Sequence, residues 1–223
     1  MRTKIVIIGG KGSAIVIAEQ IYDAQVKGND VEFLGFAFDD ESFGKEINGF
    51  PIICKTFDAK SYFEKYIDVK FIYQLYRPDL MKERIELLDS FKIPLDKFCT
   101  FVHPSALIAK SANIGIGTCI LANAVINPKA RIGNFNTIHS NTLIGHDTSI
   151  GEYNFFAAHS VVGSNDKIGN GNFIGLNTSF NNYITIGDFC FVGMASNVIK
   201  SIESHVKVIG NPARPFNNNI KAL

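Results

Sequence analysis

His146 and Asp147 are the pair of residues best suited to acid–base chemistry, and they lie in the stretch NTLIGHDTSIGEYNFF, residues 141–156. An imidazole changes its charge near neutral pH, and a carboxylate on one ring nitrogen leaves the other free to accept a proton. His146 follows Ile144 by two positions, where the repeat described below carries mostly polar residues, so we expect it to point outward. It is either a general base at a surface cleft or a solvated surface histidine.

A second candidate site is the stretch GGKGSA, residues 9–14, which joins a predicted strand to a predicted helix. Backbone N–H groups and the positive end of a helix dipole suit a diphosphate. The GxGxxG pattern is incomplete because Ile15 stands in place of the last glycine, and this disfavours NAD. Asp39 and Asp40 follow the next predicted strand, where they either bind a ribose or form a solvated turn.

Residues 1–100 read as alternating strands and helices, which is typical of a small parallel sheet with crossover helices. The expected strands are KIVIIGG, VEFLGFAFDD and VKFIYQL. The expected helices are SAIVIAEQIYDAQ and PDLMKERIELLDSF, the second with its proline at the start.

From residue 102 the period changes to six. Every sixth residue from Val102 to Val198 is apolar, glycine often follows it, and a small side chain often stands four positions after it. A period of six fits neither a helix nor a plain sheet. It predicts a coil of short strands that turn at their glycines, with three faces and one inward aliphatic residue per strand.

The composition excludes several classes of protein. A formal net charge of +1 gives no electrostatic case for nucleic acid or an anionic membrane. The first apolar run, residues 5–8, is too short for a signal peptide or a membrane span. The four cysteines (Cys54, Cys99, Cys119, Cys190) form no CxxC pair, so we expect a cytoplasmic protein with reduced thiols and no metal.

Several segments occur in a fixed order along nearly the whole chain: IVIIGGKG, FAFDD, INGFPII, VHPSALI, ILANAVINPKARIGN, IGHDTSIGEYNF and IGNPARP. In this combination the sequence resembles the sialic-acid and bacillosamine acetyltransferases of the PglD/NeuD type. The resemblance implies a Rossmann-like α/β domain over residues 1–100 that binds a nucleotide-sugar. A left-handed parallel β-helix with a C-terminal tail, residues 101–223, would then carry acetyl transfer.

The activity that the resemblance implies is acetyl-CoA-dependent N-acetylation of a nucleotide-linked amino sugar in surface glycan synthesis, by a homotrimer. The sugar, its nucleotide (UDP, dTDP or GDP) and the reacting carbon stay open. O-acetylation of a sugar such as a sialic acid is one alternative, and a non-catalytic trimeric scaffold is another. We expect the outer face of the coil to carry only polar groups beside the His–Asp pair, so that a second subunit must close the site.

The resemblance also implies roles for individual residues. His146 would be the base, and Asp147 would orient it. The nucleotide-sugar would contact Gly10, Lys11, Gly12, Ser13, Asp39 and Asp40. The CoA groove would be lined by Phe155, Ser164, Leu176, Gly193, Met194 and Lys200.

Three positions depart from the family pattern. Relatives often have histidine where this chain has Ser13, and Met194 replaces a glycine. His139 takes the place that glycine holds in the repeat. It is expected either to be a turn residue with positive φ or to contact the substrate.

Overall fold

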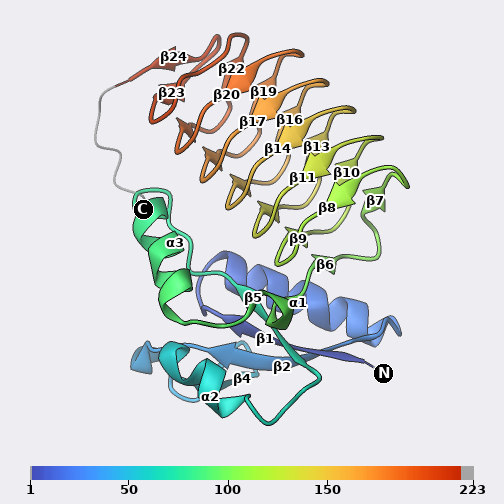
Figure 1. The fold of residues 1–223 in the computed structure, drawn as a ribbon, viewed down its shortest axis with the longest axis vertical. Helices are drawn as coiled ribbons and strands as arrows, with labels where there is room; N and C mark the ends of the chain where they lie inside the picture. Colours follow the sequence, from blue (N-terminus) through green and yellow to red (C-terminus); the bar gives the residue numbers. More distant parts are fainter. Residues whose placement is uncertain (1, 217–223) are drawn as a thin grey trace.

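The computed structural model describes residues 2–216 and consists of an α/β domain on which a column of short strands stands (Figure 1). The predicted tail residues 217–223 lie outside the described residues. The α/β elements are β1 (Thr3–Ile8), α1 (Ser13–Val26), β2 (Val31–Ala37), β3 (Glu46–Ile47), β4 (Phe50–Cys54), α2 (Ala59–Tyr62), β5 (Val69–Tyr73) and α3 (Met81–Ser90). Short 3-10 turns lie at Glu41–Phe43, Thr56–Asp58 and Leu95–Lys97.

The sheet has the strand order β3-β4-β2-β1-β5 and is parallel except at one edge. There β3 pairs antiparallel with β4, and the two are joined by Asn48 and Gly49, both with positive φ. Such a turn matches the twist of a hairpin. The predicted small parallel sheet is therefore present, with one added antiparallel edge strand.

The α3 helix begins later than predicted. Leu80 is its N-cap residue and has non-helical angles, and the Leu80 N–H donates to the Arg77 carbonyl in a preceding turn. Pro78 lies in that turn, so the expectation that a proline would open the helix was wrong.

The second half is a parallel β-helix with three faces, and this confirms the predicted fold class. The cleft face contains β6 (Phe101–Val102), β9 (Cys119–Ile120), β12 (Thr137–Ile138), β15 (Phe155–Phe156), β18 (Phe173–Ile174), β21 (Phe191–Val192), β23 (Lys207–Ile209) and β24 (Arg214–Pro215). The aliphatic face contains β7 (Leu107–Ile108), β10 (Val125–Ile126), β13 (Leu143–Ile144), β16 (Val161–Val162), β19 (Ser179–Phe180) and β22 (Asn197–Val198). The polar face contains β8 (Asn113–Ile114), β11 (Arg131–Ile132), β14 (Ser149–Ile150), β17 (Lys167–Ile168) and β20 (Thr185–Ile186).

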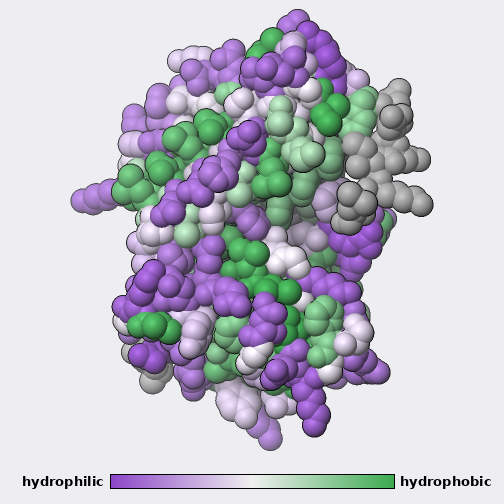
Figure 2. Space-filling model, turned by 180° about the vertical axis from the view of Figure 1, so that it is seen from behind, coloured by the Kyte–Doolittle hydropathy of each residue, from purple (hydrophilic) through white to green (hydrophobic). Residues whose placement is uncertain are grey.

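The sequence led us to expect only polar side chains on the outside of the coil. The outward side chains of the aliphatic face contradict this expectation, because several of them are apolar. Its first four strands begin with Leu107, Val125, Leu143 and Val161, of which Leu107 is 65% exposed. Figure 2 shows a diagonal row of hydrophobic residues on the upper, β-helical part of the molecule, where these strands lie. Successive strands stack in register, as Leu143 does on Val125 and Val161, so the four side chains form one apolar row.

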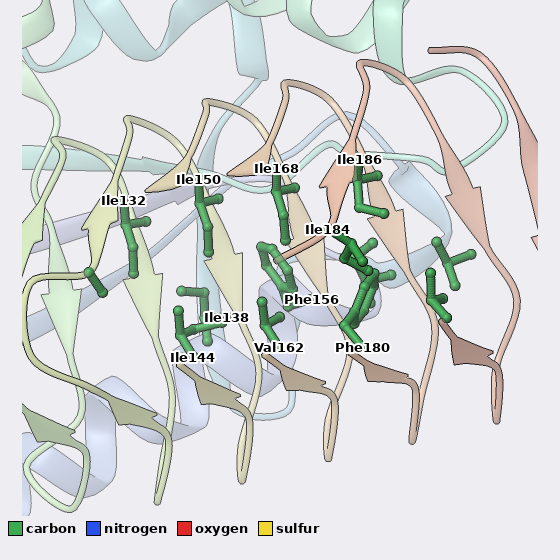
Figure 3. Packing of buried hydrophobic residues seen from close by; sticks show 14 of the residues in the cluster. Ile132, Ile138, Ile144, Ile150, Phe156, Val162, Ile168, Phe180, Ile184 and Ile186 are labelled. Carbon is green, nitrogen blue, oxygen red and sulfur yellow. The ribbon is translucent and has the colours of Figure 1, made fainter. Parts of the chain in front are cut away.

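The interior of the coil is a column of mostly aliphatic side chains that also contains Phe156 and Phe180 (Figure 3). Val102 of the first strand was expected to point inward but is 37% exposed. Ile138, Ile144 and Ile150, which come from three successive faces, are all buried and share one cluster. The period of six places these side chains inside, because each face contributes one inward position before the chain turns.

The turns of the coil do not occur at the glycines that directly follow the inward residues. The left-handed conformation falls two residues later, for example at Asp147 after Gly145, at Tyr153 after Gly151 and at Gly171 after Gly169. Gly145 is required instead by close approach, because a Cβ there would lie 2.2 Å from the Gly163 carbonyl oxygen of the next coil. His139 occupies a glycine position without a positive φ, so its prediction as a left-handed turn residue was wrong.

Polar side chains are stacked beneath the turns and hydrogen-bond from coil to coil. Asn136 Oδ1 accepts from the Asn154 N–H at 2.9 Å, and Asn154 Oδ1 accepts from the Asn172 N–H at 2.9 Å. Asp166 holds an equivalent position in another stack, where its Oδ1 accepts from the Ile184 N–H at 2.9 Å. Its Oδ2 is buried without a partner among residues 2–216, and burial raises the pKa of this carboxyl to about 6.

We expect Asp166→Asn to stabilise the protein at neutral pH. Because the folded pKa of about 6 exceeds the ordinary 3.8, the stability that Asp166 contributes is complete below about pH 3.8 and is lost as pH rises through 6. An asparagine has no charge to desolvate, so the gain should reach up to about 3 kcal/mol near pH 7.5. Urea unfolding of both proteins near pH 7.5 and near pH 4 measures it. An equal difference at the two pH values would contradict this assignment.

The α/β domain is fastened to the first coils through α1 and the end of β5. Leu121 and Phe101 of the coil share a buried cluster with Ile17 of α1. The Gln20 side chain accepts from the Ala122 N–H at 2.8 Å and donates to the Ser140 hydroxyl at 3.0 Å. These contacts place the carboxyl-terminal edge of the sheet next to the cleft face. No helix within residues 2–216 is both long and apolar enough to span a membrane.

Candidate active site

A cleft of about 880 Å³ lies between the carboxyl ends of β1, β2 and β5 and the cleft face of the coil. The chain leaves β1 toward β2 on one side, whereas β5 lies on the other side of β1. Ligands of open parallel sheets bind in the crevice at such a reversal of strand order. The lining residues come from the segments that follow β1, β2, β4 and β5, from the start of α1, from α3 and from two coils: Lys11, Gly12, Ser13, Phe38, Asp39, Asp40, Thr56, Phe57, Gln74, Leu75, Tyr76, Arg77, Pro78, Met81, Arg84, Leu87, Phe155 and Phe173.

The glycine loop and the acidic pair meet in this cleft. Lys11 Nζ lies 2.6 Å from Asp40 Oδ2, and the Asp40 side chain also accepts from the N–H and hydroxyl of Ser42. The hydrogen bonds from Lys11 and Ser42 lower the pKa of Asp40 to about 2. Asp39 accepts from the Thr56 N–H at 3.1 Å and from its hydroxyl at 2.5 Å. The two carboxylates are thus ordered at a cleft wall rather than forming a freely solvated turn.

Gly10 lies behind the cleft rather than in its lining. A Cβ at this position would meet the Phe38 ring at 2.5 Å, so glycine lets the loop pack against this ring, which follows β2. The α1 helix then begins at Ser13, and no side chain caps it. The Ala14 and Ile15 N–H groups donate to the Lys11 and Gly12 carbonyls, so within the described chain the first turn leaves the Ser13 N–H for an anion.

His139 connects the coil to the glycine loop. Its Nε2 lies 2.9 Å from the Ser13 hydroxyl, and its ring centroid lies 5.0 Å from that of Phe155. Burial lowers the pKa of His139 to about 4, so the ring is neutral at physiological pH. Ser13 and Phe155 both line the cleft, so His139 supports the cleft wall from behind.

The wall of the cleft on the coil side is a stack of aromatic rings. The Phe155 and Phe173 rings are stacked 5.1 Å apart, and Phe173 and Phe191 are stacked 5.2 Å apart. The family resemblance implies that Phe155 lines the CoA groove, and in the structure it lines the same cleft as Asp39 and Asp40. Sequence reasoning missed Phe173, although FF, FI and FV recur at the same point of three successive coils.

The other residues predicted for CoA fall on two different edges of the coil. Leu176 and Met194 follow β18 and β21 at the edge between the cleft and aliphatic faces, and both are exposed. They lie on adjacent coils, because the Ala195 N–H donates to the Leu176 carbonyl. Gly193 directly precedes Met194. Ser164 and Lys200 follow β16 and β22 at the edge between the aliphatic and polar faces.

His146 belongs to this second edge. Its Nδ1 lies 2.8 Å from Asp147 Oδ2, so the predicted hydrogen-bonded pair is present, and both side chains are exposed. This hydrogen bond is the largest cause of a lowered Asp147 pKa. The remaining ring nitrogen has no hydrogen-bond partner within residues 2–216 and is free to accept a proton. His146 does not line the cleft, so one chain keeps its His–Asp pair and its cleft apart.

Comparisons with known proteins show which solved structures share this fold. The model of the bacterial transferase hexapeptide (six repeats) matches residues 129–164. No curated protein matches the chain in sequence. Among solved structures, PerB from Caulobacter crescentus, in complex with CoA and GDP-perosamine, is 22% identical with a TM-score of 0.81, over 96% of this chain and 97% of that one.

Two further solved structures are similar over their full length. The acetyltransferase domain of PglB from Neisseria gonorrhoeae, in complex with acetyl coenzyme A, is 22% identical with a TM-score of 0.81, over 97% of this chain and 100% of that one. WeeI from Acinetobacter baumannii is 21% identical with a TM-score of 0.78, over 96% of this chain and 100% of that one. The chain therefore has the two-part fold of PerB and the PglB acetyltransferase domain, an α/β domain followed by a hexapeptide β-helix.

Proposed function

We propose that the protein is an acetyl-CoA-dependent N-acetyltransferase that acts on the amine of a nucleotide-linked amino sugar in surface glycan synthesis. The observation that carries the proposal is one cleft in which the glycine loop, Asp39 and Asp40 meet the cleft face of a hexapeptide coil. Two proteins of the same fold bind the corresponding molecules: PerB binds CoA and GDP-perosamine, and the PglB domain binds acetyl coenzyme A. A related solved structure is named perosamine N-acetyltransferase.

We further propose that the active unit is a homotrimer. The His146 edge and the Leu176–Met194 edge flank the aliphatic face on its two sides, so one chain cannot bring them together. A neighbouring coil packed on the apolar row from Leu107 to Val161 would cover that row and join the His146 edge of one subunit to the opposite edge of the next. Closed cyclic assemblies are built from such head-to-tail contacts.

In this arrangement the α/β domain holds the nucleotide, and the amine of the sugar faces His146 of the neighbouring subunit. The amine nitrogen attacks the thioester carbonyl carbon of acetyl-CoA, and His146 Nε2 takes the proton that the nitrogen loses. The C–S bond then breaks, and the CoA sulfur leaves as a thiolate that is protonated in turn. Asp147 holds Nδ1 and stabilises the imidazolium that forms.

The expected compartment is the cytoplasm. The four cysteines of the described chain are free, and two of them, Cys119 and Cys190, are buried. Free thiols of this kind fit a reducing compartment.

The direct test offers purified protein and acetyl-CoA a panel of UDP-, dTDP- and GDP-linked amino sugars together with free sialic acids. Release of the CoA thiol is measured, and the product is identified by mass spectrometry. Turnover with one nucleotide amino sugar supports the proposal. Turnover with free sialic acids alone would replace it with sugar O-acetylation. No turnover with any acceptor would favour the non-catalytic scaffold.

We expect His139→Ala to raise the KM for the nucleotide-sugar several-fold and to change kcat much less. The loss of the hydrogen bond to Ser13 loosens the loop that forms one cleft wall. Because the pKa of His139 is about 4, the effect should not vary between pH 6 and 8. Steady-state kinetics measure it, with His139→Gln as a control that keeps a donor for Ser13. A fall in kcat as large as that of a His146 variant would instead identify His139 as the base.

A further inference from the structure

Arg84 lines the cleft but has no role in the site described so far. It lies in the first turn of α3, on the side of the cleft that follows β5. Its main-chain carbonyl accepts a hydrogen bond from the Tyr73 hydroxyl at 2.5 Å, which fixes this turn of the helix to β5. The base of the side chain is therefore held in place by the sheet itself.

The Arg84 guanidinium is the unsatisfied cation of the cleft. Its Nε is buried and has no hydrogen-bond partner anywhere in residues 2–216. The other charged groups of the lining have partners there: Lys11 pairs with Asp40 at 2.6 Å, Arg77 pairs with Asp79 at 2.7 Å, and Asp39 accepts from Thr56.

A guanidinium stays charged at all physiological pH values, so burial cannot be relieved by loss of a proton. Leaving one of its donors buried and unpaired costs free energy, and such a group in a native protein requires an explanation. An oxyanion in the cleft would satisfy it, because the fork of an arginine matches the oxygens of a phosphate or a carboxylate.

We propose that Arg84 binds a phosphate oxygen of the nucleoside diphosphate carried by the acceptor. This inference rests on the proposed function, in which the cleft holds a nucleotide-linked sugar. The glycine loop lies on the β1 side of the crevice and Arg84 on the β5 side, so a diphosphate in the crevice is held from both. The other source of an oxyanion is the carboxylate of an acidic sugar.

The test measures binding by isothermal titration calorimetry and needs no acetyl transfer. UDP, dTDP and GDP are compared with their nucleosides on wild-type protein and on Arg84→Gln. We expect Arg84→Gln to lower the affinity for the diphosphates roughly 10- to 100-fold and to leave the affinity for the nucleosides unchanged. Arg84→Lys keeps the charge but loses the forked guanidinium, so its affinity for the diphosphates should lie between those of the wild type and Arg84→Gln. Lys82→Gln is the matched control, since it removes one positive charge from an exposed position of the same helix.

Several results would overturn the inference. One is equal affinity of the wild type and Arg84→Gln for the diphosphates. Others are an equal loss for diphosphates and nucleosides, and no binding of any diphosphate to the wild type. A loss confined to free sialic acid would assign Arg84 to a carboxylate instead. Because these ligands are unreactive, the outcome does not depend on whether the acetylation panel succeeds.

A thermal melt separates a binding role from a structural one. The Nε of Arg84 has no hydrogen-bond partner within the described chain, so the replacement breaks no hydrogen bond of this atom. The melting temperature of ligand-free Arg84→Gln should therefore equal or exceed that of the wild type. A clear fall would show that the arginine holds the fold together, and the inference would be wrong.

Discussion

His146→Ala is expected to lower kcat roughly 10²- to 10⁴-fold while the affinity for acetyl-CoA and the proposed trimer persist. The side chain points away from the core and makes its hydrogen bond to Asp147 alone, so its loss leaves no cavity. What is lost is the group that we propose collects the proton from the attacking nitrogen. Rapid-mixing or steady-state thiol release measures the change, and light scattering and calorimetry check the assembly and the cofactor site.

The pH dependence of the same variant separates amine from hydroxyl acceptors. A bound amine becomes more nucleophilic as it loses its own proton, so for an amine the defect should shrink as pH rises from 6 to 9. A sugar hydroxyl keeps its proton throughout this range and needs the base at every pH. Asp147→Asn should cost less than His146→Ala, because it only orients and polarises the ring. Unchanged turnover of His146→Ala over the whole range would exclude His146 as the base.

Leu143→Glu is expected to yield monomers whose turnover is lower by on the order of 10²-fold or more. Leu143 lies in the middle of the apolar row, between Val125 and Val161, and a carboxylate there would be buried without a partner in each subunit contact. Without the contact, His146 cannot reach a neighbouring cleft. Ser149→Glu on the polar face is the matched control and should leave a trimer of normal activity.

Mixed trimers test the division of labour between subunits. His146→Ala and Asp39→Ala are expected to be nearly inactive alone, one for lack of the base and the other for lack of the acceptor site. When equal amounts are co-expressed, about a quarter of the subunit contacts join an intact cleft to an intact His146, and activity should return to about that fraction. No recovery in verified mixed trimers would mean that His146 serves its own chain, and the proposed arrangement would be wrong.

The sequence alone determined the coil and the residues that fill it. An apolar residue at every sixth position from Val102 to Val198 indicates one way to bury nearly all of them, because each coil contacts only its neighbours and repeats the same local geometry. The hydrogen bond between His146 and Asp147 was also predictable, since the two are adjacent in the chain. The sequence showed that glycines recur in the repeat, but it did not show what they are needed for. Gly145 allows the close approach of two coils, and the turn falls at Asp147.

Only the tertiary structure decided where these parts meet. The contact between Ser13 and His139 joins residues 126 positions apart and depends on how α1 docks on the first coils. The same docking places Arg84 and Phe173 on opposite walls of one cleft and leaves His146 on an edge away from it. No local pattern carries this information, because the docking depends on buried contacts between two domains of different period. Each domain's own sequence fixes its interior but not the partner surface that it meets.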